Sequence, residues 1–164
     1  ANQHAPLDVT SVSELARAGI VVDPRTDRTV FNSQNTAFIR ELAPAMFILP
    51  GSGTTEFIGR NSDIFAACIM RRVMRDRGLR CHFGKPFVWQ QRNSHDLVKD
   101  MRSEQLALER VDEFARYVDR YPLSSDSLIP FLREFYTEAR QALSWWSPSA
   151  SEAAMAWLDD CETM

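Results

Sequence analysis

The sequence predicts an α/β (or α+β) chain in which a partial mixed sheet of short strands is followed by a helical C-terminal part. Between residues 20 and 61, and again between 79 and 88, the apolar residues fall in short runs interrupted by proline, glycine and amide residues, which is typical of short strands and turns. From residue 94 onward they recur every three or four positions, as on amphipathic helices. We therefore expect a single domain or domain fragment over residues 1–164, with a mixed part at 1–93 and a helical part at 94–164.

Up to residue 61, the mixed part is predicted to contain only short elements. A short helix is expected at 10–18, because capping residues stand at its start and Gly19 follows its end. Pro24 and Asp27 favour a turn at 23–28. The glycine-rich stretch 51–59 is expected to be a surface loop, with a mobile loop beside a site as the alternative. The other predicted elements are a strand at 29–31, a helix at 37–42 that Pro44 ends, and a buried strand at 45–49 closed by Pro50.

A longer helix is predicted at 62–77, with Ser62 as its N-cap and Gly78 as its stop. Residues 64–70 are apolar on nearly every side, so this helix should be central. The last turns of this helix carry a run of basic residues, Arg71, Arg72, Arg75 and Arg77. Positive charge there suits the negative end of the helix dipole. A nucleic-acid surface is disfavoured, because Asp76 interrupts the run and no aromatic residues alternate with the arginines.

Residues 79–88 should form two short strands or a kinked edge strand, because Gly84 and Pro86 break the run. His82 is expected to be a surface residue of this segment.

The helical part should hold three helices. Ser94 is the expected N-cap of the longest, which runs to about residue 121 and has one apolar face. The next spans 128–143, and the last begins near Ser149 or Ser151. Between these two, the pair Trp145-Trp146 is expected to seal a helix–helix junction, with stacking on a sugar or base as the alternative.

The overall composition is that of an ordinary globular protein. Hydrophobic residues make up 45% of the 164 residues and charged residues 25%, which is enough for one domain with a core. A net charge of -3 argues against nucleic acid or an anionic membrane as a partner. No signal peptide is visible, and no apolar run is long enough to cross a bilayer.

The three cysteines, Cys68, Cys81 and Cys161, are widely spaced and follow no metal-ligand pattern. Cys68 and Cys81 stand in apolar runs, so we expect them to be reduced core thiols. Reduced thiols favour a reducing compartment over secretion, and we therefore expect a cytoplasmic protein.

Two polar stretches are the candidate site. One follows a predicted strand and opens a predicted helix, a place where backbone N–H groups and side chains converge on ligands; it holds Gln91, Arg92, Asn93, His95 and Asp96. Its alternative reading is a capped turn whose arginine and asparagine are solvated. The other stretch is the run of five polar residues at 32–36, which lies between apolar runs. It either caps the next helix or binds a ligand through its polar side chains.

Four motifs that occur in order resemble a known family. They are Phe31-Asn-Ser-Gln-Asn-Thr36, Leu49-Pro50, Arg60-Asn-Ser-Asp63-Ile64, and Gln91-Arg-Asn-Ser-His-Asp96 with a trailing Asp100. In this order the motifs resemble the C-terminal half of the glycosyltransferase-like domain of the plant STELLO proteins and their nematode and microbial relatives. The resemblance covers about residues 8–104.

The resemblance implies the acceptor-side half of a GT-A-like fold that transfers a sugar from a nucleotide sugar to a carbohydrate acceptor. Under it, Asp63 is the expected catalytic base with Asp96 as the runner-up, and His95 is the expected ligand of Mn²⁺ or Mg²⁺. Arg60 and Arg92 would hold phosphate, because a guanidinium fork fits its oxygens. The residues expected to bind substrate are Asn32, Gln34, Asn35, Thr36, Arg60, Gln91, Arg92 and Asn93.

Each of these roles has a plainer alternative. Asp63, Asp96 and Asp100 also suit the positive end of a helix dipole, and His95 also suits a first-turn residue bonded to a backbone carbonyl.

The sequence also departs from the family's pattern. The half that carries the nucleotide pocket and the acidic metal motif is missing, and Thr10 stands where the family has the second acid of a Pro-Asp-Val-Asp run. Phe65 and Ala66 stand where the family has tryptophan and arginine. Three explanations remain open: the chain is a fragment, a second polypeptide supplies the missing half, or the activity has been lost.

A hypothesis from another class is a non-enzymatic helical protein–protein interaction module. The amphipathic helices at 94–121 and 128–143 would then bind a partner protein. If the chain is a piece cut from a longer protein, we expect some of its apolar surface to be left uncovered and the chain to oligomerise or aggregate, whereas a self-contained module should stay monomeric at modest concentration.

Overall fold

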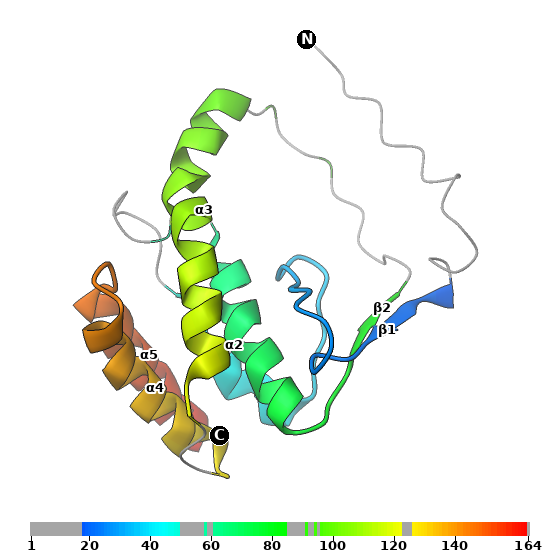
Figure 1. Ribbon diagram of the computed structural model, residues 1–164, viewed down its shortest axis with the longest axis vertical. Helices are drawn as coiled ribbons and strands as arrows, with labels where there is room; N and C mark the ends of the chain where they lie inside the picture. Colours follow the sequence, from blue (N-terminus) through cyan, green and yellow to red (C-terminus); the bar gives the residue numbers. More distant parts are fainter. Residues whose placement is uncertain are drawn as a thin grey trace.

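The computed structural model describes residues 18–49, 61–84, 96–122 and 126–163, together with Ile58, Gln91 and Ser94. Within them, helices predominate and the strands form one small sheet, so the general α+β expectation holds (Figure 1). The elements in chain order are β1 (Ile20–Val22), the 3-10 helix η2 (Arg40–Ala45), α2 (Ser62–Asp76), β2 (Cys81–Phe83), α3 (Leu97–Arg120), α4 (Leu128–Ala142) and α5 (Pro148–Thr163).

Helix α2 lies at the centre of the described part, as its apolar pattern predicted. Ten consecutive residues, from Phe65 to Met74, are buried, so no side of the helix faces water along this stretch. Gly78 follows it with a φ of 66°, the left-handed conformation that ends many helices and that glycine adopts without strain. The N-cap is Asn61, one residue before the predicted Ser62, and it makes no side-chain capping bond.

Helices α2 and α3 pack side by side and run in the same direction. Near the start of α2, Phe65 packs on Phe114 with ring centroids 4.9 Å apart. Near its end, Arg72 donates from Nη1 to the carbonyl oxygen of Val118 at 2.7 Å. Because α3 has 24 residues and α2 has 15, the first half of α3 extends beyond α2 (Figure 1).

Helices α4 and α5 pack against each other, and the tryptophan pair joins them to α3. Trp146 is buried and stacks on Phe114 with ring centroids 5.7 Å apart. Its Nε1 donates to Ser151 Oγ at 2.9 Å, and that hydroxyl donates to the carbonyl oxygen of Tyr136 at 2.8 Å. The prediction that these tryptophans seal a helix–helix junction is confirmed.

The two strands form an antiparallel pair in which Ile20 faces Phe83 and Val22 faces Cys81. The expected mixed sheet is therefore wrong for the described residues, where the sheet has two strands and is antiparallel. His82 is exposed, as predicted, and its imidazole lies so close to Gly19 that a Cβ there would meet its Nε2 at 2.2 Å.

Several short elements differ from the prediction. Residues 29–31 and 45–49 are not strands, and the helix expected at 37–42 is instead η2, which contains Pro44. The segment after η2 packs on a helix instead of pairing with a strand, because Phe47 stacks on Trp157 of α5. The same tryptophan also contacts η2, where its Nε1 donates to the carbonyl oxygen of Pro44 at 3.2 Å. The predicted helix at 10–18 and loop at 51–59 lie outside the described residues, apart from Ala18, which is helical, and Ile58, which is buried.

None of the helices among the described residues combines the length and the hydrophobicity that crossing a bilayer requires.

Replacing Phe114 by alanine should lower the free energy of unfolding by about 3–5 kcal/mol, because it removes a fully buried ring that packs against α2, α4 and the segment between α4 and α5. Met101→Ala is the control: its side chain is exposed, so the cost should stay within about 0.5 kcal/mol. Urea denaturation followed by circular dichroism measures both. Equal losses in the two variants would contradict the assignment of the core.

Candidate functional site

The start of α2 and the polar run at 32–36 lie together, although 30 residues separate them in the chain. Asp63, in the first turn of α2, accepts two hydrogen bonds at Oδ2 from Ser33, one from the backbone N at 3.0 Å and one from Oγ at 3.2 Å. Its Oδ1 accepts from the backbone N of Ile64 at 2.9 Å. One carboxylate therefore fixes the polar run against a helix N-terminus, where negative charge is also favoured by the helix dipole.

The polar run is a side-chain-stabilised turn. The Oδ1 of Asn32 accepts from the backbone N of Gln34 at 3.1 Å, and the carbonyl oxygen of Asn32 accepts from Thr36 Oγ1. These bonds shape the backbone and leave Gln34 and Asn35 on the surface, while Thr36 is half-buried. The run therefore does not cap a following helix directly, because η2 begins only at Arg40.

Asp96 caps α3, and the prediction that Ser94 does so is wrong. The Asp96 Oδ1 accepts from the backbone N of Val98 and of Lys99, both at 3.1 Å, and the helix begins at Leu97. A carboxylate at this position satisfies two orphan N–H groups and also carries the charge that the helix N-terminus favours. The described bonds of Asp96 are therefore those of a capping residue.

The structure does not bring Asp96 to Asp63. Because α2 and α3 run in the same direction and Phe65 lies level with Phe114, Asp63 lies level with residue 112 of α3. Asp96 is 16 residues nearer the start of α3, which corresponds to about 24 Å along the helix axis. The two candidate bases therefore belong to different regions of the surface.

The remaining candidate residues are Arg60, Arg92, Asn93 and His95, which lie outside the described residues, and Gln91, which is described and exposed. The expected convergence of the arginines and the histidine on the polar run stays a prediction. In the part of the chain that the structure describes, no three histidine, cysteine, aspartate or glutamate side chains are close enough together to hold a metal ion. The expected ligand of Mn²⁺ or Mg²⁺, His95, lies outside the described residues, so its role as a metal ligand stays a prediction.

Cys68 is buried and free, as the sequence predicted. Burial raises the pKa of its thiol to about 11, so it is protonated at neutral pH. This thiol is a core group and is excluded as a nucleophile.

Sequence reasoning missed a cluster of buried charge at the other end of α2. The side chains of Arg71 and Arg72 are 4% and 7% exposed, and both contact the last turn of α3, where Asp119 is 9% exposed. The only local signal was the presence of two arginines directly after an apolar run. Their partner is 48 residues away from Arg71 in the chain, beyond the reach of any pattern along one helix.

No family model matches the chain, and no match is found among curated proteins.

Replacing Asp96 by alanine should speed hydrogen exchange at the amides of Val98 and Lys99, because both lose their acceptor, and should cost about 0.5–2 kcal/mol of stability. Ser94→Ala should change neither quantity, since Ser94 precedes the cap. Exchange measured by NMR separates the two variants. Faster exchange in the Ser94 variant alone would restore the cap that the sequence suggested.

Proposed function

We propose that the chain is the acceptor-side part of a glycosyltransferase that moves a sugar from a nucleotide sugar to a carbohydrate acceptor. The observation that carries this proposal is the contact between Ser33 and Asp63. It places a carboxylate at a helix N-terminus beside a turn that exposes Gln34 and Asn35. Amide groups of this kind both donate to and accept from sugar hydroxyls. The resemblance of the four ordered motifs supports the same assignment.

In this proposal Asp63 accepts the proton of the acceptor hydroxyl as that oxygen attacks the anomeric carbon of the donor. Ser33 is a positioning residue, because its two bonds to Oδ2 fix the orientation of the carboxylate. Gln34 and Asn35 orient the acceptor by hydrogen bonds to its other hydroxyls. Arg60 and Arg92 are proposed to neutralise the leaving diphosphate, as guanidinium groups do at phosphate sites.

The proposal is tested by the release of nucleoside diphosphate from UDP-sugars in the presence of carbohydrate acceptors. Asp63→Asn keeps an acceptor oxygen for Ser33 but cannot take a proton, so turnover should fall by about 10²–10⁴-fold. Ser33→Ala loses only the hydroxyl bond and keeps the backbone bond, so turnover should fall by less than about tenfold. If Asp63→Asn turned over like the wild type, Asp63 would be a structural residue only.

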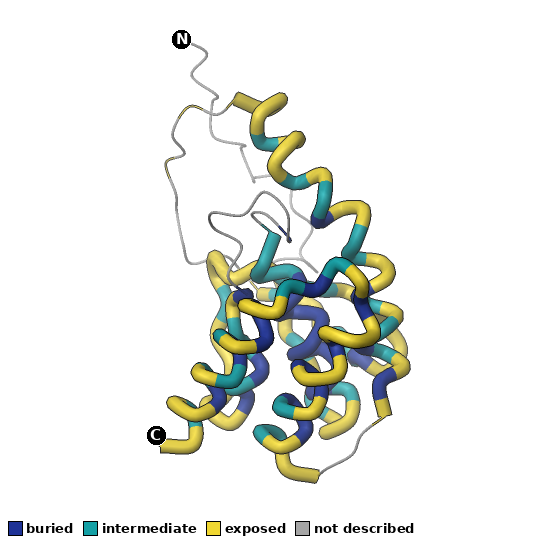
Figure 2. The backbone as a smooth tube through the Cα atoms, turned by 90° about the vertical axis from the view of Figure 1, so that its left-hand side faces the viewer, coloured by how far each residue is buried: buried dark blue, intermediate teal, exposed yellow. Residues whose placement is uncertain are grey.

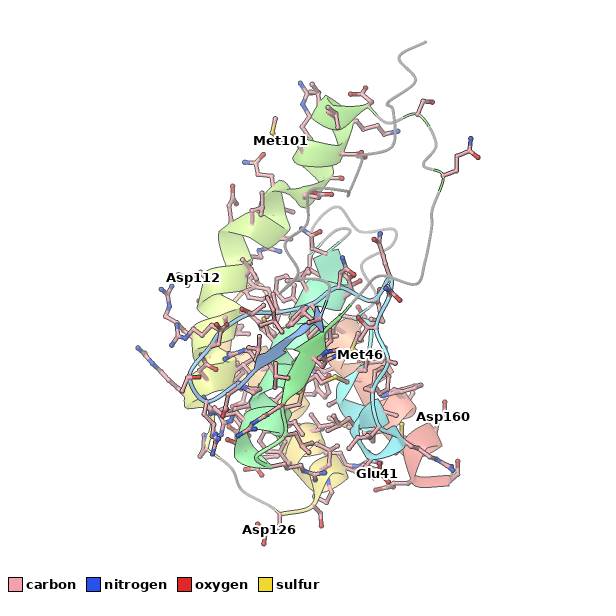
Figure 3. All side chains as sticks on the ribbon, turned by 90° about the vertical axis from the view of Figure 1, so that its right-hand side faces the viewer. Glu41, Met46, Met101, Asp112, Asp126 and Asp160 are labelled. Carbon is pink, nitrogen blue, oxygen red and sulfur yellow. The ribbon has the colours of Figure 1, made fainter. Side chains whose placement is uncertain are left out.

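A second candidate function is supported by the exposed half of α3. Leu97 is 75% exposed, and Met101 and Leu108 are each 63% exposed, although all three lie on one face of the helix. Figure 2 shows that this end of α3 is mostly exposed, and in Figure 3 Met101 points away from the rest of the molecule. Farther along the same face, Val111 and Ala115 pack against the core. An apolar stripe that continues past the core is typical of a helix that pairs with another helix.

If this stripe binds a second copy of the chain, light scattering should show a mass that rises with protein concentration. Glutamate at both Met101 and Leu108 should abolish the association, because it buries two charges in the seam. Ser103→Glu is the matched control, since Ser103 lies on the opposite side of α3 and the new charge stays in water. A wild-type protein that stays monomeric at high concentration would remove this candidate.

A further inference from the structure

The chain contains two described Asn-Ser steps, Asn32-Ser33 and Asn61-Ser62, whose surroundings differ. Asparagine is chemically labile at such a step, because the backbone N of the next residue can attack the carbon of the side-chain amide. The attack closes a five-membered imide and releases ammonia. Since the two steps have the same dipeptide chemistry, their surroundings decide which of them reacts.

The turn at Asn32 brings the reacting groups together. Asn32 Oδ1 accepts a hydrogen bond from the backbone N of Gln34 at 3.1 Å, which closes an Asx turn. In such a turn the side chain folds back along its own backbone, so the amide carbon Cγ of Asn32 is directed toward the backbone N of Ser33. The Gln34 N–H also lies where negative charge develops on Oδ1 when that carbon is attacked.

A base is already bonded to the attacking nitrogen. The backbone N of Ser33 donates to Asp63 Oδ2 at 3.0 Å. A carboxylate in this position can take the N–H proton as the nitrogen attacks. Asn32 and Ser33 are both exposed, so water can reach the imide and ammonia can leave.

The second step lacks the arrangement found at the first. Asn61 is the N-cap of α2, and its side chain makes no capping hydrogen bond to the helix. Its amide is therefore not polarised by a backbone N–H of the first turn. Asn61 is also half-buried, which limits the access of water. The same dipeptide thus occurs in one chain with and without an Asx turn, which makes Asn61 an internal control.

We propose that Asn32-Ser33 is a self-modifying site at which Asp63 acts as the base and Asn32 becomes aspartate or isoaspartate. The Ser33 nitrogen bonds to Asn32 Cγ while Asp63 takes the N–H proton. The tetrahedral intermediate then expels Nδ2 as ammonia, which receives that proton from Asp63. Water opens the imide at either of its carbonyl carbons. One product is aspartate, and the other is isoaspartate, in which the backbone runs through the former side chain.

The modification would alter the turn that Asp63 holds. Both products place a second carboxylate next to that of Asp63, and like charges repel each other. Isoaspartate also lengthens the backbone by a further carbon atom, which displaces the Ser33 N–H from Asp63. Loss of glycosyl transfer as the chain ages is the expected consequence. This consequence rests on the proposed function, whereas the modification itself does not.

The test is peptide mapping by tandem mass spectrometry of the whole folded chain, sampled over time at neutral pH in water enriched in heavy oxygen. Asn32 should take up oxygen from water at least about tenfold faster than Asn61 in the same molecules. Isoaspartate at position 32 identifies the imide route, because direct hydrolysis of the amide gives aspartate alone. In urea the two rates should converge, since both then depend on the dipeptide and not on the fold.

Replacing Asp63 by asparagine keeps an oxygen that accepts from Ser33 but removes the base. The reaction at Asn32 should slow by at least about tenfold, while that at Asn61 stays unchanged. Asp96→Asn is the matched control, because it neutralises a carboxylate at the start of a different helix and should leave the Asn32 rate as in the wild type.

Equal rates at Asn32 and Asn61 in the folded chain would overturn the proposal, as would aspartate formed without isoaspartate. Faster reaction in Asp63→Asn would show that the carboxylate protects the turn instead of driving the reaction. The readout is the covalent state of the chain, so it does not depend on turnover. A chain that is modified but transfers no sugar would refute only the proposed function, and an active chain that stays unmodified would refute only this inference.

Discussion

The structure depends on a helix that is buried on every side and still carries charge. Along Phe65–Met74 of α2 no face is left for water, yet the stretch includes Arg71 and Arg72. A buried guanidinium group needs partners within the protein. Asp119 and the last carbonyl oxygens of α3 supply them, so the end of α3 is fixed beside the end of α2 by charge as well as by packing.

This constraint also decides what lies at the opposite ends of the two helices. The C-terminal ends of α2 and α3 are bound to each other and the two helices run in the same direction. The difference between their lengths must therefore appear at the N-terminal end of α3. That end carries Asp96, Leu97 and Met101 away from the core, where a cap and two apolar side chains meet solvent. The separation of Asp96 from Asp63 and the exposed stripe of α3 are therefore two consequences of the same packing.

The helices could be predicted from sequence because their signals are local. The period of apolar residues, Gly78 and the prolines place both ends of α2 and α4 within one residue of their observed bounds, and the start of α5 within three residues. The strands expected at 29–31 and 45–49 failed because a short apolar run fits a strand and an irregular segment equally well. The choice is made by distant partners such as Trp157, which packs on Phe47.

The candidate site was predictable in its residue types but not in its contacts. Two polar runs were evident, whereas the pairing of Ser33 with Asp63 joins positions 30 residues apart. One of its two hydrogen bonds comes from a backbone N–H, which any residue except proline would supply. This has a chemical consequence. A carboxylate has about four acceptor positions, and bonds from Ser33 and Ile64 take three of those on Asp63. The carboxylate can thus hold the turn and still accept one hydroxyl, so a structural role and a role as a base are compatible at the same residue.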